Sequence, residues 1–234
     1  MTPVRVSVSG PAESYSRMTI KVEPESDGWG SNDMDGTDLV ITVPVKARVE
    51  VGTVSASIEA AGIAGTHADL ESVSGSISFA GDAQRVSLKT VSGSIEGEGD
   101  GRDWDVGTVS GRIALPKAGG EIRIESVSGS IEVDFGRAER LRAETVSGRI
   151  VASGQLLPNG TVAMQSVSGS IELALGAEVD ARINAKTFSG GIDTDFGTAE
   201  SGGFGGGKTL EAQVGDGSAD IRLESFSGRI KIRK

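Results

Sequence analysis

Cysteine is absent from this sequence of 234 residues, and histidine occurs only once, as His67. The chain can therefore form no disulfide, no catalytic thiolate and no zinc–thiolate centre. A Ser-His-acid triad would have to recruit His67, which we interpret as a surface residue in a turn between two repeats. A metal centre with a single histidine would consist almost entirely of carboxylates. We expect no catalytic residue, no cofactor-binding residue and no metal ligand.

Aromatic residues and long apolar runs are also scarce. The sequence has two tryptophans, one tyrosine and six phenylalanines, compared with 35 glycines. This composition is unusual for a compact enzyme, and it fits a thin aliphatic core between frequent tight turns. No stretch approaches the roughly 20 apolar residues of a membrane-spanning helix, so we expect no transmembrane segment.

Basic residues are outnumbered by acidic ones. The sequence has 23 lysines and arginines against 33 aspartates and glutamates, which gives a net charge of −10. A field of this sign repels nucleic acids and anionic lipid headgroups. We therefore expect no nucleic-acid partner, and the remaining partner classes are an envelope component, a glycan or a protein. The oligomeric state is left open.

A six-residue pattern, [T/S]-[V/F]-S-[G/A]-x-I, occurs nine times. The copies begin at Thr53, Ser72, Thr90, Thr108, Ser126, Thr145, Ser166, Thr187 and Ser225. Successive copies are 18 to 21 residues apart, except for the last step of 38 residues. A fixed period near 20 residues is typical of stacked repeats. We interpret the doubled last step as the place of a decayed copy, with a remnant at residues 214–221.

Each repeat is predicted to contain a strand, a corner and a second strand. In residues 121–135, the alternation of apolar side chains changes parity between Ser126 and Val127, which indicates a corner. The second position (Val or Phe) and the sixth (Ile) are predicted to form two inward ladders. Glycine at the fourth position predicts a tight backbone that leaves no room for a Cβ. The fifth position (serine, arginine or glycine) and the mostly acidic seventh are predicted to face water.

These repeats predict an all-β fold, a single-stranded parallel β-helix (β-solenoid) of about ten coils of 18–21 residues. We predict a right-handed coil, because β-crossovers usually turn that way. Residues 1–45 are predicted to form an N-terminal cap, a β-hairpin of residues 18–22 and 39–43. Residues 46–234 are predicted to form the solenoid, in one structural unit with the cap. Lys231, Arg233 and Lys234 on the last strand are predicted to discourage end-to-end pairing.

Two other segments resemble binding motifs. Residues 202–209 (GGFGGGKT) match the phosphate-binding loop pattern, but an alternating, strand-like run follows where that motif needs a helix, so we interpret residues 201–209 as a flexible loop. Residues 31–36 resemble the start of a calcium loop but lack its first aspartate and its bidentate glutamate. A second acidic turn holds Glu98, Asp100, Asp103 and Asp105, and either turn could bind calcium only weakly.

The ordered T-V-S-G-x-I copies, with preceding strands such as residues 69–71 and 122–125, resemble a bacterial family of unknown function that is described as adhesins with β-strand repeats. The lead-in at residues 38–59 and the closing run at residues 214–230 are similar to the family's first and last coils. The resemblance covers about residues 39–234. It implies a single exported β-solenoid domain in the periplasm or on the cell envelope, associated with adhesion or envelope stress. The family has no established catalytic residues to carry over.

Two functional hypotheses follow. The first is a non-enzymatic β-solenoid of the cell envelope, an adhesin or interaction scaffold. The second is a carbohydrate-active β-helix that binds or cleaves a polysaccharide with stacked carboxylates such as Glu132 and Glu172. The first residues, MTPVRVSVSG, lack the layout of a secretory signal. We expect a periplasmic or cell-surface location if a signal peptide was removed, and a cytoplasmic one otherwise.

Overall fold

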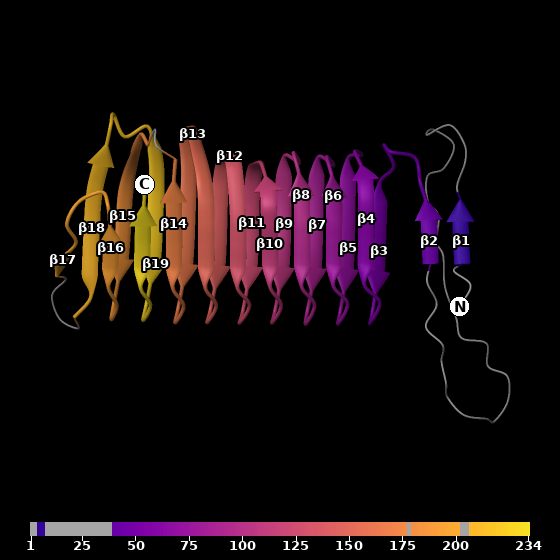
Figure 1. Cartoon of the computed structure of the whole chain (residues 1–234), viewed down its shortest axis with the longest axis horizontal. Coiled ribbons are helices and arrows are strands. Elements are labelled where there is room, and N and C mark those ends of the chain that lie inside the picture. Colours follow the sequence, from indigo (N-terminus) through magenta and orange to yellow (C-terminus); the bar gives the residue numbers. More distant parts are fainter. Residues whose placement is uncertain (1–3, 8–38, 177–178, 202–205) are drawn as a thin grey trace, which may run out of the picture. The chain divides into compact units, whose positions relative to one another are not determined.

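The computed structural model describes residues 4–7, 39–176, 179–201 and 206–234. Within these residues all regular structure is β-strand (Figure 1). The chain divides into two compact units, Met1–Ala47 and Arg48–Lys234, and each is described by itself.

The first unit contains β1 (Val4–Ser7) and β2 (Leu39–Thr42), which pair in parallel with Val4 opposite Leu39. The predicted strand at residues 39–43 is thus present as β2. Its predicted hairpin partner, residues 18–22, lies outside the described residues, and the partner that the structure describes is β1. The capping role of this unit stays a prediction.

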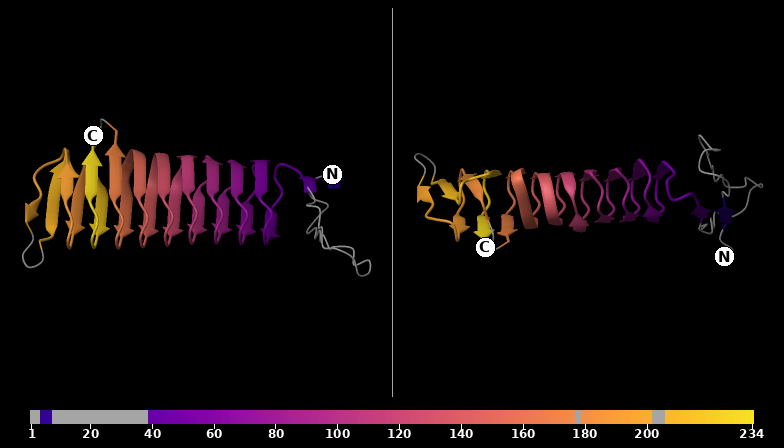
Figure 2. Two further views of the ribbon diagram at one scale, coloured as in Figure 1. Left: turned by 60° about the horizontal axis from the view of Figure 1, so that its bottom comes forward. Right: turned by 90° about the horizontal axis from the view of Figure 1, so that it is seen from above.

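The second unit is a parallel β-solenoid, as predicted, whose coils wind through two strands separated by a corner (Figure 2). The strands before the corners are β3 (Val49–Thr53), β5 (His67–Ser72), β7 (Arg85–Thr90), β9 (Asp103–Thr108), β11 (Gly120–Ser126), β15 (Ala181–Thr187) and β19 (Ala219–Ser225). The strands after the corners are β4 (Ile58–Ile63), β6 (Ile77–Gly81), β8 (Ile95–Gly99), β10 (Ile113–Ala118), β14 (Ile171–Leu175), β16 (Ile192–Thr194) and β20 (Ile230–Arg233). Two long strands, β12 (Ile131–Thr145) and β13 (Ile150–Ser166), run from the end of one corner to the start of the next.

The coils stack in register, so that like residues lie on like. Ile113 pairs with Ile95 on one side and with Ile131 on the other, and Ile131 pairs with Ile150. The sixth-position isoleucine is buried in all nine copies, with at most 9% of its surface exposed. This confirms the predicted inward ladder of isoleucines, which supplies one rung of the core per coil.

The glycine at the fourth position is required by the contact between coils. A Cβ on Gly129 would lie 1.8 Å from the carbonyl oxygen of Gly111 in the preceding coil. The same clash recurs along the stack, at 2.0 Å for Gly93 and 1.8 Å for Gly148. The prediction that this position has no room for a side chain is therefore confirmed.

The prediction for the second position is wrong, because its side chains point outward. Val127 is 47% exposed, whereas Ser126 before it is only 7% exposed. The hydroxyl of Ser126 faces inward and accepts a hydrogen bond of 2.9 Å from the backbone N–H of Gly129. This bond closes the corner around the hydroxyl, so Val127 and Ser128 are both outside the core.

The order of the coils departs from the order of the sequence at the C-terminal end. The last coil, β19 and β20, lies between the coil of β13 and β14 and the coil of β15 and β16. The chain passes over one coil position, forms β15 and β16, and then returns to fill the gap. The coils at this end therefore do not follow one another in the order of the sequence.

The segment between β16 and β19 explains the doubled repeat step. It contains β17 (Glu200–Ser201) and β18 (Lys208–Val214), and β18 pairs antiparallel with β15 and with β17. Residues 214–221 are therefore no remnant of a decayed copy: Val214 ends β18, and Ala219 begins β19. Because β17 and β18 occupy this segment and its described residues form no further coil, the stack has fewer coils than the ten that the sequence predicts.

The charges on the final strand also have a different role from the one predicted. Because β20 is inside the stack, Lys231 pairs with Glu172 of β14, and Arg233 pairs with Asp193 and Asp195 of the coil on the other side. These charges join neighbouring coils and do not protect a free end.

Candidate functional site

The outward second-position side chains form one continuous apolar line along the corners, which we call the corner stripe. Its members are between 44% and 73% exposed. In spatial order they are Val54, Val73, Val91, Val109, Val127, Val146, Val167, Phe226 and Phe188. Backbone hydrogen bonds fix this order at the end of the stack, where Ser227 N–H donates to Val167 O at 2.9 Å and Ser189 N–H donates to Phe226 O at 2.8 Å.

The two phenylalanines give the stripe an aromatic end. The rings of Phe188 and Phe226 stack with centroids 4.7 Å apart and planes 6° from parallel, and both rings are more than half exposed. They are adjacent only because the last coil is inserted beside the coil of β15. An exposed stack of two rings is a strong apolar anchor for a partner.

Sequence reasoning missed the corner stripe, although one signal pointed to it. Seven copies carry valine at the second position and two carry the much larger phenylalanine. A tightly stacked core rung would not accept that increase in volume without strain. The variation in size was therefore a sign that this position has open space beside it.

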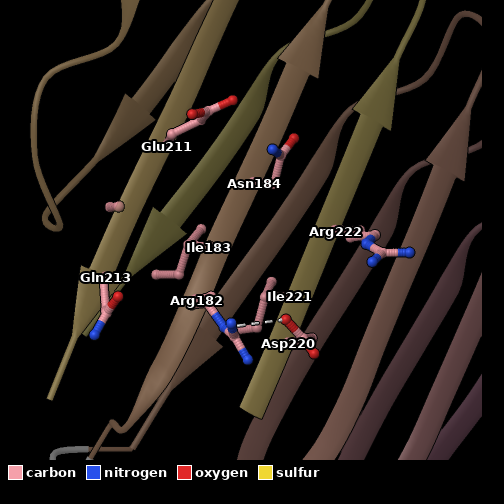
Figure 3. Close-up of a pocket in the computed structure, with 9 residues that line it drawn as sticks. Arg182, Ile183, Asn184, Glu211, Gln213, Asp220, Ile221 and Arg222 are labelled. Carbon is pink, nitrogen blue, oxygen red and sulfur yellow. Dashed lines mark ion pairs between the residues drawn. The ribbon is translucent and has the colours of Figure 1, made fainter. Parts of the chain in front are cut away.

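The second candidate site is a depression on the outer face of β15, β18 and β19 (Figure 3). It has a volume of about 460 Å³, and its polar lining residues are Arg182, Asn184, Glu211, Gln213, Asp220 and Arg222. Register places Gln213, Arg182 and Asp220 in one row across the three strands, and Glu211, Asn184 and Arg222 in the next. The antiparallel pairing of β18, which no repeat pattern predicts, creates this site.

The charges in the depression are only partly paired. Arg182 Nε lies 3.6 Å from Asp220 Oδ1, and Figure 3 shows these two side chains directed toward each other. Arg222 forms no ion pair with any described residue, and its neighbour on the β13 side is the small Ala163. Its guanidinium is thus free to bind a ligand group that enters the depression.

The stacked carboxylates that could serve as an acid–base pair are held in ion pairs. Glu132 pairs with Arg112, and Glu172 pairs with Arg149 and with Lys231 Nζ at 3.2 Å. The hydrogen bond from Arg149, followed by the one from Lys231, lowers the pKa of Glu172. A general acid in glycoside cleavage needs a raised pKa, so Glu172 is unsuited to that role.

The phosphate-binding pattern at residues 202–209 lacks the geometry of that motif. Lys208 begins β18, a strand, where the motif requires the N-terminus of a helix. Residues 202–205, on which the flexible-loop interpretation also depends, lie outside the described residues.

The remaining predicted candidates in the described residues lie on the surface, and all but Glu98 have a charged or polar partner. His67 is the first residue of β5 rather than part of a turn, with its Nε2 3.4 Å from Arg85 Nη1. In the acidic turn, Asp103 pairs with Arg85, Asp105 with Lys89, and Asp100 with Lys117. No cluster of three or more metal-ligating residues occurs among the residues that the structure describes. The other calcium-like segment, residues 31–36, lies outside them.

The comparisons with known proteins agree with the fold. No helix in the described part of the chain is long and apolar enough to cross a membrane. No curated protein and no solved structure matches the chain. The sequence model of the Toastrack DUF4097 family, a domain of unknown function, matches residues 6–233, nearly the whole length. The chain therefore belongs to the Toastrack DUF4097 family.

Proposed function

We propose that this chain is a non-enzymatic interaction scaffold of the cell envelope, an adhesin-like β-solenoid that binds a protein partner through its corner stripe. The observation that carries this proposal is the row of nine apolar side chains, each about half exposed or more. The resemblance to exported repeat proteins supports the envelope location.

The size of the stripe supports a binding role. Half-exposed valines and phenylalanines in this number present on the order of 600 Å² of apolar surface, at the upper limit of what monomeric proteins usually expose. The stripe is continuous because each coil adds one rung. Such a surface, bordered by serines and charged residues, is typical of a protein-binding site.

The charged surface also favours a scaffold over an enzyme. The ion pairs on the outer faces mostly join neighbouring coils, as in Arg85–Asp103, Arg140–Glu121 and Arg149–Glu172. Each carboxylate in these pairs is neutralised by a cation. This arrangement stabilises the stack and does not favour these three carboxylates as general acids.

Site-specific photo-crosslinking in cells that produce the protein tests the proposal. A photoreactive residue at Val109 is expected to give defined protein crosslinks, and one at Glu96, exposed on the outer face of β8, is expected to give few. Cell fractionation should recover the protein with the envelope or periplasm. Equal labelling from the two positions, or recovery in the cytosol, would contradict the proposal.

The depression supports a second candidate function, the binding of a polysaccharide without cleavage. Its arginines, amides and carboxylates are the donors and acceptors that bind sugar hydroxyls, and its volume of about 460 Å³ accommodates a short glycan segment. A glycan array should then show binding that Arg222→Ala with Asn184→Ala removes and Arg123→Ala, on β11, retains. If no glycan on the array binds, this candidate is rejected.

A further inference from the structure

We infer that the partner on the corner stripe is a second copy of this chain, in a two-fold dimer whose axis runs along the stripe so that each rung meets the same rung of the other copy. The inference rests on the proposed function, because it names the partner of the surface described there. Spacing, area and charge each support it.

The spacing of the rungs favours a partner with the same repeat. Neighbouring rungs belong to hydrogen-bonded strands, which lie about 4.8 Å apart. A partner whose apolar groups recur at the same interval can contact all nine rungs in the same way. A second copy of the chain meets this condition along the whole stripe.

The area is sufficient for a stable dimer. A stable interface buries about 800 Å² on each partner. The apolar stripe, on the order of 600 Å² by its half-exposed side chains, approaches this value when the outward third-position serines beside it are included. These serines are also prepared for burial, since the hydroxyls of Ser128 and Ser147 lie 3.3 and 3.5 Å from carbonyl oxygens of the preceding coil.

The two sides of the stripe differ in charge. The residues just before the inward hydroxyls form a mostly acidic side, with Glu71, Lys89, Glu125, Glu144, Glu224 and Lys186 as its charged members. The fifth positions form the other side, whose charged members are Arg112, Arg149 and Arg229, and which has no acid. The charged residues are therefore mostly acidic on one side of the stripe and all basic on the other. Among the described residues, Glu125, Glu144, Arg112 and Arg149 are paired within the chain, and Glu224 and Arg229 are not.

This asymmetry selects one orientation. When the two-fold axis runs along the stripe, the acidic side of each copy faces the basic side of the other, and Glu224 comes opposite the partner's Arg229 of the same rung. Neither of these residues forms an ion pair with a described residue of its own chain. In the antiparallel arrangement the acidic sides would face each other, which is unfavourable. The selected orientation also places Phe226 and Phe188 against their own counterparts.

The mass in solution is the first test. Analytical ultracentrifugation of the purified chain should give twice the 23.9 kDa of one copy. Val109→Lys with Val146→Lys should give a monomer with an unchanged circular dichroism spectrum, because neither side chain is in the core. The matched control, Ser78→Lys with Ala114→Lys on the outer faces of β6 and β10, should stay dimeric. A wild-type monomer, or a dimer that survives the stripe variant, would overturn the inference.

Single cysteines test the orientation without background, because the chain has no cysteine of its own. In the proposed dimer, Val73→Cys and Val127→Cys should each oxidise to an intermolecular disulfide, which needs Cα atoms within roughly 7 Å. In the antiparallel arrangement only Val127, the central rung, would meet itself, so crosslinking at Val127 alone would overturn the proposed geometry. A monomeric chain whose Val109 position still photo-crosslinks to another protein would reject the dimer and leave the proposed function standing.

Discussion

At the scale of single residues, each corner depends on one inward hydroxyl and one glycine. Ser126 Oγ accepts from Gly129 N–H, and the equivalent Ser225 Oγ donates to the carbonyl of Gly169 in the adjacent coil at 3.2 Å. The hydroxyl thus satisfies backbone groups that the core would otherwise leave without a partner. The glycine lets that carbonyl approach closely. Ala56 is accepted in the first copy because the solenoid unit has no earlier corner beneath it.

We predict that Gly129→Ala strongly destabilises the protein. Its Cβ would lie 1.8 Å from the carbonyl oxygen of Gly111, and backbone in two coils would have to move. The expected loss is about 3 kcal/mol or more in the free energy of unfolding, measured by urea denaturation. Gly107→Ala is the control, since its nearest neighbour would be 3.9 Å away. Similar unfolding midpoints for the two variants would contradict the proposed contact.

At the scale of strands, the C-terminal coil is held by neighbours on both sides. β19 pairs with β13 and β15, and β20 pairs with β14 and β16. The inserted coil pairs with an edge of each of the four strands β13, β14, β15 and β16, and β18 covers the other edge of β15. Buried backbone groups are thereby satisfied at the end where the repeat pattern stops.

The coil order can be tested by disulfide formation. Val167→Cys with Phe226→Cys should crosslink within one chain, because these residues lie on adjacent coils about 4.8 Å apart. Val167→Cys with Phe188→Cys, which is the closer pair in sequence, should not, because one coil lies between them. A reversal of these yields would show that the coils follow the order of the sequence. Mass spectrometry of the oxidised proteins at low concentration gives the measurement.

The ion pairs of Glu172 make the contact between β14 and β20 sensitive to acid. Arg149 and Lys231 lower the pKa of Glu172 in the folded protein. Its contribution is therefore present above the ordinary glutamate pKa of about 4.3 and is lost as the pH falls through the lower, folded value. Between about pH 5 and pH 3, the wild type should lose up to about 1 kcal/mol more stability than Glu172→Gln.

Chemical denaturation at a series of pH values checks this difference. Lys231→Gln, which removes one of the two cations, should reduce the same acid-dependent loss. Parallel pH profiles for the wild type and Glu172→Gln would show that the pair contributes nothing to folding.

At the scale of the whole solenoid, stability is expected to follow the stacking of coils rather than the position in the sequence. Each coil pairs with the coils beside it, as in other repeat proteins, so opening starts where a coil has a neighbour on one side only. Chain ends usually fray first. Here the last strand, β20, is enclosed between two coils, whereas β18 is an edge strand over most of its length.

Hydrogen exchange should show that β20, at the end of the chain, is better protected than β18, which precedes it in the sequence. We expect the amides of β20, four residues in the final five of the chain, to exchange at least tenfold more slowly than those of residues 210–214 in β18. The N–H of Ile230, which donates to Gly191 O at 2.9 Å, is the clearest probe. Fast exchange throughout β20 would place the last coil outside the stack.

The repeat alone was enough to predict the parallel β-solenoid, the register, the inward isoleucines and the constrained glycines. These features are local, because a period near 20 residues and an alternation of two fix what each coil can place against its neighbours. The prediction that Val127 faces the core was wrong, because the alternation of inward and outward side chains can change at either of two adjacent residues of a corner. The buried hydroxyl of Ser126 decides between them, and its partners belong to the folded corner.

Only the tertiary structure decided the order of the last coils, the antiparallel pairing of β18, and with them the polar depression and the stacked Phe188 and Phe226. All repeats carry nearly the same edges, so each can pair with any other and the sequence pattern does not choose among them. The choice is made by which arrangement leaves the fewest strand edges unpaired, and that depends on the whole stack at once.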